Sequence, residues 1–158
     1  MISEWEFLGR VAVAALLGGM LGFDRELRRA AAGVRTYALV GMGSAAFIAA
    51  AILIAQAADA DPSTFNDNQS RMAAGVVAGV GFLGAGAILR TNERVHGITT
   101  AAGIWVTAAV GLLIGTGSWI LGVGVTILAL IIIAGLRPLH ESIEKPEDDS
   151  GDSGPGWL

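Results

Sequence analysis

Acidic and basic side chains stand together in one short segment of this chain. Asp24, Arg25 and Glu26 follow one another in FDRE, and Arg35 follows in the segment GVRT. Asp, Glu and His are the usual proton relays and cation sites of membrane pumps. We expect Asp24 or Glu26 to pair with Arg35, or with Arg90 at the end of the apolar run FLGAGAILR. These residues are the first candidates for a functional site.

Three threonines stand next to these charges. Thr36 follows Arg35, and Thr99 and Thr100 form the end of GITT. Because Thr is a common N-cap residue, all three are predicted to cap helices. In the simplest interpretation, the arginines anchor the helices at the membrane surface and the threonines cap them. This leaves Asp24 and Glu26 unexplained, because membrane anchors do not need carboxylates. The sharper interpretation is a polar cluster that packs the helix ends or binds something there, and it predicts that Arg35→Ala lowers thermal stability or abolishes function. Its members are Asp24, Arg25, Glu26, Arg35, Thr36, Arg90, Thr99 and Thr100.

A second polar group is predicted on the opposite side. Asn68, Gln69 and Arg71 open one apolar run, and Arg10 stands near the start of another, close to Glu6. We expect Asn68, Gln69 and Arg71 to meet Arg10 and Glu6 there.

The apolar runs between these groups hold no carboxylate, histidine, lysine or arginine. Asp, Glu, His, Lys and Arg are absent from residues 36–58, 72–89 and 97–136. Mg²⁺ gives up water reluctantly and favours carboxylates, so a cation site in the middle of the membrane is poorly supported. The chain also has no cysteine, no nucleotide-binding loop and no Ser-His-Asp set, and His96 and His140 each stand alone. The sequence therefore predicts no enzyme, no cofactor and no metal site.

Membrane-spanning helices must position the polar groups. Of 158 residues, 53% are hydrophobic and 15% are charged, whereas about 25% of residues are charged in soluble domains. A spanning helix needs about 20 apolar residues, and the longest charge-free run is long enough for two. The predicted spans lie near residues 5–23, 36–58 and 72–89 and, separated by GTGS, twice within 97–136. We predict an all-α membrane bundle of five helices.

The bases indicate which side of the membrane is cytoplasmic. Most of them fall in DRELRRAAAGVR, in RTNERVHG and in the C-terminal tail, which lie on one side of a bundle with five spans. The loop DADPSTFNDNQS on the other side is acidic. The positive-inside rule places the N-terminus outside and the C-terminus in the cytoplasm. We expect a membrane domain over residues 1–137, a disordered acidic tail at 138–158, the lipid bilayer as surroundings and no nucleic-acid partner.

Glycine is concentrated in the third predicted span. In lipid the helix backbone bonds to itself, so glycine is tolerated, and small residues let helices approach closely. The run AAGVVAGVGFLGAGA is small around most of its circumference, which predicts the central, most enclosed helix, while the Ile- and Leu-rich fifth span faces lipid. Glycine faces are also expected to join copies into a homo-oligomer, a dimer. The predicted helix-packing residues are Gly18, Gly22, Gly75, Gly79, Gly81, Gly84, Gly86 and Trp105, and G-x-x-x-G recurs at Gly111 and Gly115.

A weak internal repeat has a period of 64 residues. Its pairs include Gly22 with Gly86, Gly33 with Gly97, and Thr36 with Thr100. Parallel repeats of this kind occur in transporters, although a chain rich in Ala and Gly also produces chance matches.

Four ordered segments resemble the MgtC/SapB family of bacterial membrane proteins. They are LLGGMLGFDRE, AGVRTYALVGMGSA, SRMAAGVVAGVGFLGAGAILR and GITTAAGIWVTAAVG. The resemblance implies a small protein with five spans in the bacterial inner membrane, linked to growth in low magnesium and to survival inside macrophages. It also implies a regulatory role toward other membrane proteins such as ATP synthase. The matching motif residues are Asp24, Arg25, Glu26, Gly33, Arg35, Thr36, Arg71, Gly79, Gly81, Gly84, Gly86, Gly97, Thr99, Thr100 and Trp105.

The resemblance is to the short form of the family. MgtC proper is similar to this chain but continues into a soluble ACT-like domain, whereas here a polar segment follows Arg137. Functions that need such a domain, such as sensing a small ligand, are therefore not expected.

Two functions stay open on the sequence alone. The first is a non-enzymatic regulator that binds other membrane proteins. The second is a transporter or channel for Mg²⁺ or another small solute, which the repeat and the glycine-rich span favour. A carboxylate inside the membrane would have favoured transport, and none is present, although a pore lined by backbone could still conduct ions.

Overall fold

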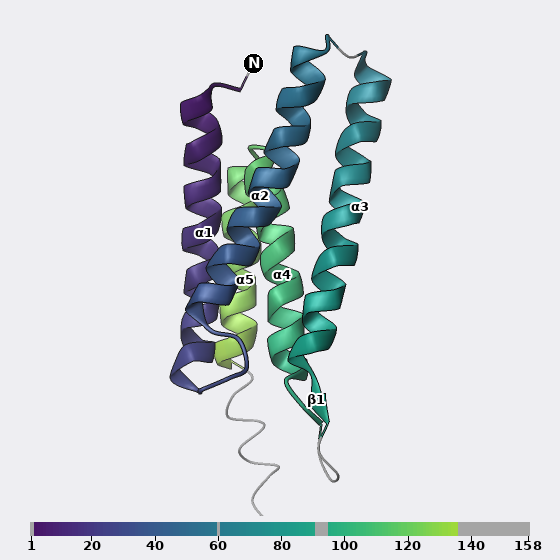
Figure 1. The fold of residues 1–158 in the computed structure, drawn as a ribbon. Coiled ribbons are helices and arrows are strands. Elements are labelled where there is room, and N and C mark those ends of the chain that lie inside the picture. Colours follow the sequence, from purple (N-terminus) through teal and green to yellow (C-terminus); the bar gives the residue numbers. More distant parts are fainter. Residues whose placement is uncertain (1, 60, 91–94, 136–158) are drawn as a thin grey trace, which may run out of the picture.

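The structure, a computed structural model, describes residues 2–59, 61–90 and 95–135. Five helices lie side by side as a bundle (Figure 1). They are α1 (Glu4–Leu27), α2 (Val34–Ala57), α3 (Pro62–Ala87), α4 (Ile98–Gly115) and α5 (Trp119–Gly135). The predicted bundle of five helices is therefore confirmed.

Four of the described helices are long and apolar enough to cross a membrane. α1, α2 and α3 have 24, 24 and 26 residues, and α4 has 18. α5 is apolar as well but has 17 residues. At 1.5 Å per residue, 18 residues span about 27 Å, close to the ~30 Å hydrocarbon core of a bilayer. The chain is a multi-pass membrane protein, and the sides on which its termini lie stay a prediction.

A short antiparallel hairpin connects α3 to α4, where the sequence predicts a plain loop. β1 (Leu89–Arg90) pairs with β2 (Val95–His96), and Leu89 lies opposite His96. His96 is exposed there, as expected of a loop residue. The predicted acidic tail at 138–158, its boundary at 137 and His140 lie outside the described residues.

Helices α2 and α4 form the centre of the bundle. α2 packs against α1, α3 and α4, and α4 packs against the other four helices. Tyr37 on α2 is the largest fully buried side chain, and Leu21 on α1 and Ile104 and Ile114 on α4 are buried with it. Figure 1 shows α4 behind and between α2 and α3.

The prediction that the third span is the central helix is wrong. In its most apolar part, 17% of α3 is buried, against 44% for α2 and for α4. Its buried residues are Val76, Val80 and Gly84, which lie on the side that meets α2 and α4. A core needs side-chain volume to fill it. α2 and α4 supply that volume, whereas the glycines of α3 do not.

Helix α3 begins earlier than the sequence indicates. The segment DADPSTFNDNQS was expected as a loop, but the helix starts at Pro62, whose fixed φ suits a first helical position. The Asp61 carboxylate accepts hydrogen bonds from the backbone N–H of Ser63 at 3.0 Å and of Thr64 at 3.2 Å. The first turns of α3 are mostly polar and exposed, apart from the half-buried Phe65.

Glycines, not threonines, precede α2 and α4. The N-cap residues are Gly33 and Gly97. Gly97 has a φ of 91°, and a Cβ at this position would overlap the carbonyl of Ala87, so only glycine fits. α2 begins at Val34 and α4 at Ile98, which agrees with the 64-residue spacing of the repeat. The predicted N-caps that this overturns are Thr36, Thr99 and Thr100.

The predicted turn between the last two spans is confirmed. α4 ends at Gly115, α5 begins at Trp119, and Gly117 between them has a φ of 88°. Along Trp119–Gly135 the buried residues are Gly122 and Thr126. Many bulky side chains of α5 are exposed, as predicted for a helix that faces lipid, while Val125, Leu130 and Ile133 pack against the core.

Candidate functional site

Polar side chains gather at the two ends of the bundle. The end where α1 stops and α2 begins is called the arginine-rich end here, because Arg25, Arg28, Arg29 and Arg35 lie in or between these helix ends. The end where α1 begins is called the N-terminal end.

Arg25 joins three helices at the arginine-rich end. Its Nη2 donates a hydrogen bond of 2.9 Å to Oγ1 of Thr100 on α4. The Tyr37 hydroxyl on α2 donates to the backbone carbonyl of the same Thr100 at 3.0 Å. Tyr37 and Thr100 are fully buried, so these bonds are costly to break. The three residues therefore fix α1, α2 and α4 to one another.

Glu26 caps the beginning of α2 from the neighbouring helix. Its Oε2 accepts a hydrogen bond from the backbone N–H of Val34 at 3.0 Å. A negative charge at this position also complements the helix dipole. A Cβ on Gly33 would overlap the carboxylate, so the glycine makes room for it. Glu26 thus serves the backbone of α2, and the predicted pair between Glu26 and Arg35 is wrong.

The other predicted cluster residues are more dispersed. Asp24 forms an ion pair with Arg28, one turn along the same helix, at 3.1 Å. Arg35, Thr36 and Thr99 are exposed. The side chain of Arg90 lies outside the described part of the chain, so its predicted pairing is untested. Of the predicted cluster, the structure brings together Arg25 and Thr100 and gives Glu26 a role at the start of α2.

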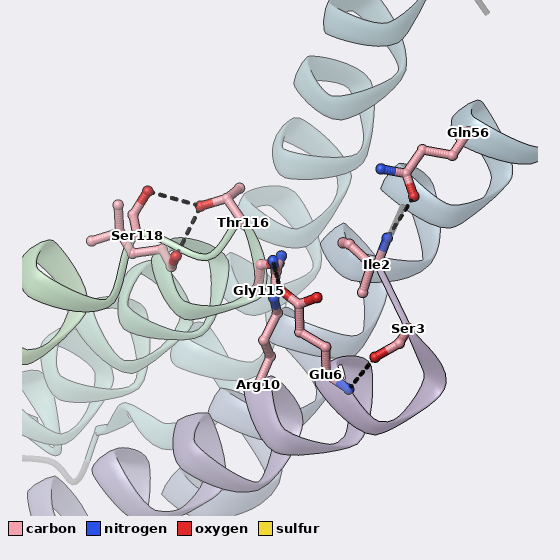
Figure 2. A network of polar contacts seen from close by, with 9 residues as sticks. Ile2, Ser3, Glu6, Arg10, Gln56, Gly115, Thr116 and Ser118 are labelled. Carbon is pink, nitrogen blue, oxygen red and sulfur yellow. Dashed lines mark hydrogen bonds and ion pairs between the residues drawn. The ribbon is translucent and has the colours of Figure 1, made fainter. Parts of the chain in front are cut away.

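Arg10 forms the centre of the polar network at the N-terminal end (Figure 2). Its Nη1 donates to the backbone carbonyl of Gly115 at 2.7 Å, and its Nη2 donates to the Glu6 carboxylate at 2.6 Å. Gly115 is the last residue of α4, where carbonyls lack a partner inside the helix and a cation complements the dipole. Arg10 is 8% exposed. It therefore caps α4 from α1.

The chain around Arg10 is shaped to receive it. A Cβ on Gly117 would lie 2.9 Å from Arg10 Nη2, so a larger residue would displace the guanidinium group. Nearby, the backbone N–H of Ile2 donates to Oε1 of Gln56 at 3.0 Å (Figure 2). This bond ties the start of the chain to the last turn of α2.

The predicted outer polar group is only partly correct. Glu6 and Arg10 do meet, but Asn68 and Arg71 are exposed on α3 and Arg10 takes its second partner from α4. The carbonyl of Gly115 was missed because a backbone acceptor has no residue-type signature. The signal present in the sequence was the i, i+4 spacing of Glu6 and Arg10.

The predicted helix-packing glycines divide into two groups. A Cβ on Gly18 would lie 2.5 Å from the carbonyl oxygen of Tyr37, and one on Gly22 would lie 2.9 Å from that of Gly33, so α1 and α2 touch through their backbones. Gly84 makes an ordinary contact, 3.7 Å from Ala101 Cβ. The remaining four have no described atom within 4 Å of a built Cβ, so they pack against no helix of the described chain, and a packing role toward other chains stays a prediction: Gly75, Gly79, Gly81 and Gly86.

Gly111 and Trp105 were also expected to pack against other helices. A Cβ on Gly111 would lie 2.5 Å from the carbonyl oxygen of Gly41, so the G-x-x-x-G pair of α4 is a close crossing with α2. Trp105 is 54% exposed, so its predicted packing role within the chain is wrong.

An apolar groove of about 660 Å³ lies between α2 and α3. We call it the α2–α3 groove. It extends from Thr36 to Phe47 along α2 and from Met72 to Leu83 along α3. A second apolar pocket, of about 260 Å³, lies among α1, α4 and α5. Within residues 2–59, 61–90 and 95–135, no three His, Asp or Glu side chains are grouped to hold a metal ion.

Known proteins are similar to this chain over most of its length. The MgtC family model matches residues 11–142. The chain is 43% identical to Escherichia coli K12 YhiD, named "Putative magnesium transporter YhiD", over 81% of this chain and 59% of YhiD. It is also 43% identical to protein SrpB of Synechococcus elongatus, over 88% of this chain and 81% of SrpB. Protein MgtC of Brucella abortus is 40% identical, over 85% of this chain and 52% of that protein.

The chain therefore spans little more than half the length of YhiD and MgtC. No solved structure gives a significant match. The MgtC family model covers most of the chain, and the chain also aligns with most of SrpB. The chain therefore belongs to the MgtC family.

Proposed function

We propose that this chain is a non-enzymatic regulator of other membrane proteins in the bacterial inner membrane, active in magnesium limitation and in stress or virulence. The family resemblance implies such a role. The observation that carries the proposal is the uncovered outer face of α3, the face that points away from α2 and α4.

The outer face of α3 combines small residues with Phe82, whose side chain is 81% exposed. Ala74, Ala78, Gly81 and Ala85 are exposed and recur at helical spacing on one side. Membrane helices associate by close packing, and small residues allow their backbones to approach. A helix surrounded by lipid alone has no need of such residues, as the Ile- and Leu-rich α5 illustrates. The outer face of α3 therefore suits the helix of a partner protein.

The remaining helices form a rigid support for α3. Arg25 and Thr100 join α1 to α4 at one end, and Arg10 and Gly115 join them at the other. These charged groups are used to hold helices together and do not line a path through the bundle. This use of charge favours a binding role over transport.

A growth test with matched glycine variants examines the proposal. A strain that lacks this gene is grown in limiting magnesium with the wild-type gene, with Gly81→Leu or with Gly124→Leu. Gly124 lies on α5, and no described atom lies within 4 Å of a Cβ built there or at Gly81, so both proteins should fold. We expect Gly124→Leu to restore growth and Gly81→Leu to fail at equal membrane abundance. Full growth with Gly81→Leu would overturn the proposal.

Transport of Mg²⁺ is the second candidate, favoured by the name of the relative YhiD and by the α2–α3 groove. It is tested by Mg²⁺ flux into liposomes that carry the purified protein and an internal indicator. The regulator proposal predicts no flux. Flux that is abolished by replacing Gly79 and Gly84 with Leu would establish transport instead.

A further inference from the structure

Three glycines line the α2–α3 groove and add no side chain to it. A Cβ built on Gly43, Gly75 or Gly79 has no described atom within 4 Å. Figure 1 shows α2 and α3 close together at the turn that joins them and further apart toward the arginine-rich end. The groove therefore results from diverging helices, and the glycines keep it free of side chains.

Apart from its threonine end, the groove offers its occupant an apolar surface. Two of its lining residues, Thr36 and Ser44, carry hydroxyl groups. The Ser44 hydroxyl donates to the Val40 carbonyl at 2.8 Å and is thus satisfied within its own helix. Thr36 lies in the first turn of α2, at the arginine-rich end. The expected occupant is apolar along its length and polar at that end.

The length of the groove distinguishes a lipid chain from a helix. Thr36 to Phe47 and Met72 to Leu83 each cover eleven residue steps, or about 16 Å at the rise of an α-helix. This is about half of the ~30 Å hydrocarbon core and thus the depth of one leaflet. A spanning helix would need a groove through the whole membrane. An acyl chain of one leaflet needs the length that is present.

The charges at the mouth complement an anionic head group. Arg35 precedes the lining residue Thr36, is exposed, and forms no hydrogen bond or ion pair within the described part of the chain. Arg29, in the segment between α1 and α2, adds a further positive charge at this end of the bundle. The nearby carboxylates are engaged elsewhere: Glu26 bonds to the Val34 N–H, and Asp24 pairs with Arg28. Guanidinium groups bind phosphate oxygens well.

We propose that the α2–α3 groove holds one acyl chain of an anionic phospholipid from the leaflet at the arginine-rich end, with its phosphate at Arg35 and Thr36. This site is separate from the outer face of α3. It does not depend on whether that face binds a partner.

Native mass spectrometry of the full chain, released from nanodiscs of equal parts phosphatidylglycerol and phosphatidylcholine, tests the proposal. The variants are Gly79→Leu, which fills the groove, Arg35→Gln, which removes the charge, and Gly124→Leu as the matched control on α5. Thermal unfolding confirms that each variant is folded.

We expect wild type and Gly124→Leu to retain one phospholipid per chain, mainly phosphatidylglycerol, and Gly79→Leu to lose it. Arg35→Gln should keep a phospholipid but lose about tenfold of the preference for phosphatidylglycerol, as expected for one charge-assisted hydrogen bond. Equal retention by Gly79→Leu and Gly124→Leu would overturn the proposal. So would a wild-type dimer that Gly79→Leu converts to a monomer without loss of lipid, because the occupant would then be a second copy.

Discussion

Arg10 is a cation held within the N-terminal end of the bundle by two short hydrogen bonds. Hydrogen bonds to charged groups contribute roughly 1.5–3 kcal/mol when they are buried. Arg10→Met should therefore lower the free energy of unfolding by about 2–3 kcal/mol in detergent micelles. Arg71→Met is the control, because Arg71 is exposed and surface changes stay within about 0.5 kcal/mol. Equal effects of the two changes would contradict the structure.

The sequence suggests that Arg35 is important for stability, but the structure indicates that Arg25 is. Arg25→Ala should therefore destabilise the protein more than Arg35→Ala. Arg25→Ala removes the bond to Thr100 and should cost about 1–2 kcal/mol of stability. Arg35→Ala changes an exposed side chain and should cost less than about 0.5 kcal/mol. Thermal unfolding of both variants under the same conditions checks this order. A less stable Arg35→Ala would show that Arg35 has a structural partner.

Asp61 gives the start of α3 a pH dependence. Hydrogen bonds from Ser63 and then from Thr64 hold the pKa of the Asp61 carboxyl well below its ordinary value of 3.8. A lowered pKa in the folded state means that the cap is fully effective above pH 3.8 and is lost as the pH falls further, toward the folded pKa. The amides of Ser63 and Thr64 should lose protection from hydrogen exchange over that range. In Asp61→Ala, protection should be low at every pH, and a wild type without pH dependence would contradict the assignment.

At the scale of the helices, glycines of identical type should respond very differently to enlargement. Gly111 lies where α4 crosses α2, with the Gly41 carbonyl 2.5 Å from a built Cβ. Gly111→Leu should separate these helices and cost more than the roughly 1–3 kcal/mol of ordinary overpacking. Gly79→Leu, with no described atom within 4 Å of its Cβ, should unfold like wild type. Similar melting of the two variants would mean that the α2–α4 crossing is not as close as described.

The sequence predicts the helices well because charge and hydropathy report on the surroundings of each segment. The charge-free runs and the GTGS turn correspond to α2, α3, α4 and α5. The partners of each helix are less predictable, because a glycine has the same signature whether a neighbour touches it, as at Gly18, or not, as at Gly79. The prediction of threonine N-caps is wrong for a related reason. Glu26 reaches the start of α2 from another helix, and only the folded chain reveals that contact.

For the whole molecule, the orientation in the membrane is the main prediction to check. The chain has no cysteine, so single cysteines can be introduced and labelled without a background. Arg28 and Asn68 are exposed on opposite ends of the bundle. We expect a membrane-impermeant maleimide to label Asn68→Cys in intact spheroplasts, and Arg28→Cys only after the membrane is opened. The reverse pattern would invert the predicted topology.

The polar contacts of α1 also show that the N-terminal end of the molecule is not level. Ile2 meets Gln56 near the end of α2, whereas Arg10, eight residues further along, meets the last residue of α4. Figure 1 likewise shows the turn between α4 and α5 lower in the bundle than the end of α2. A bilayer that matches both sides must be thinner beside α5 than beside α2 and α3, at a cost of a fraction of a kcal/mol per Å of mismatch. On this side the bundle is therefore lower at the α4–α5 turn than at α2, and we expect the protein to collect where thick and thin regions of bilayer meet.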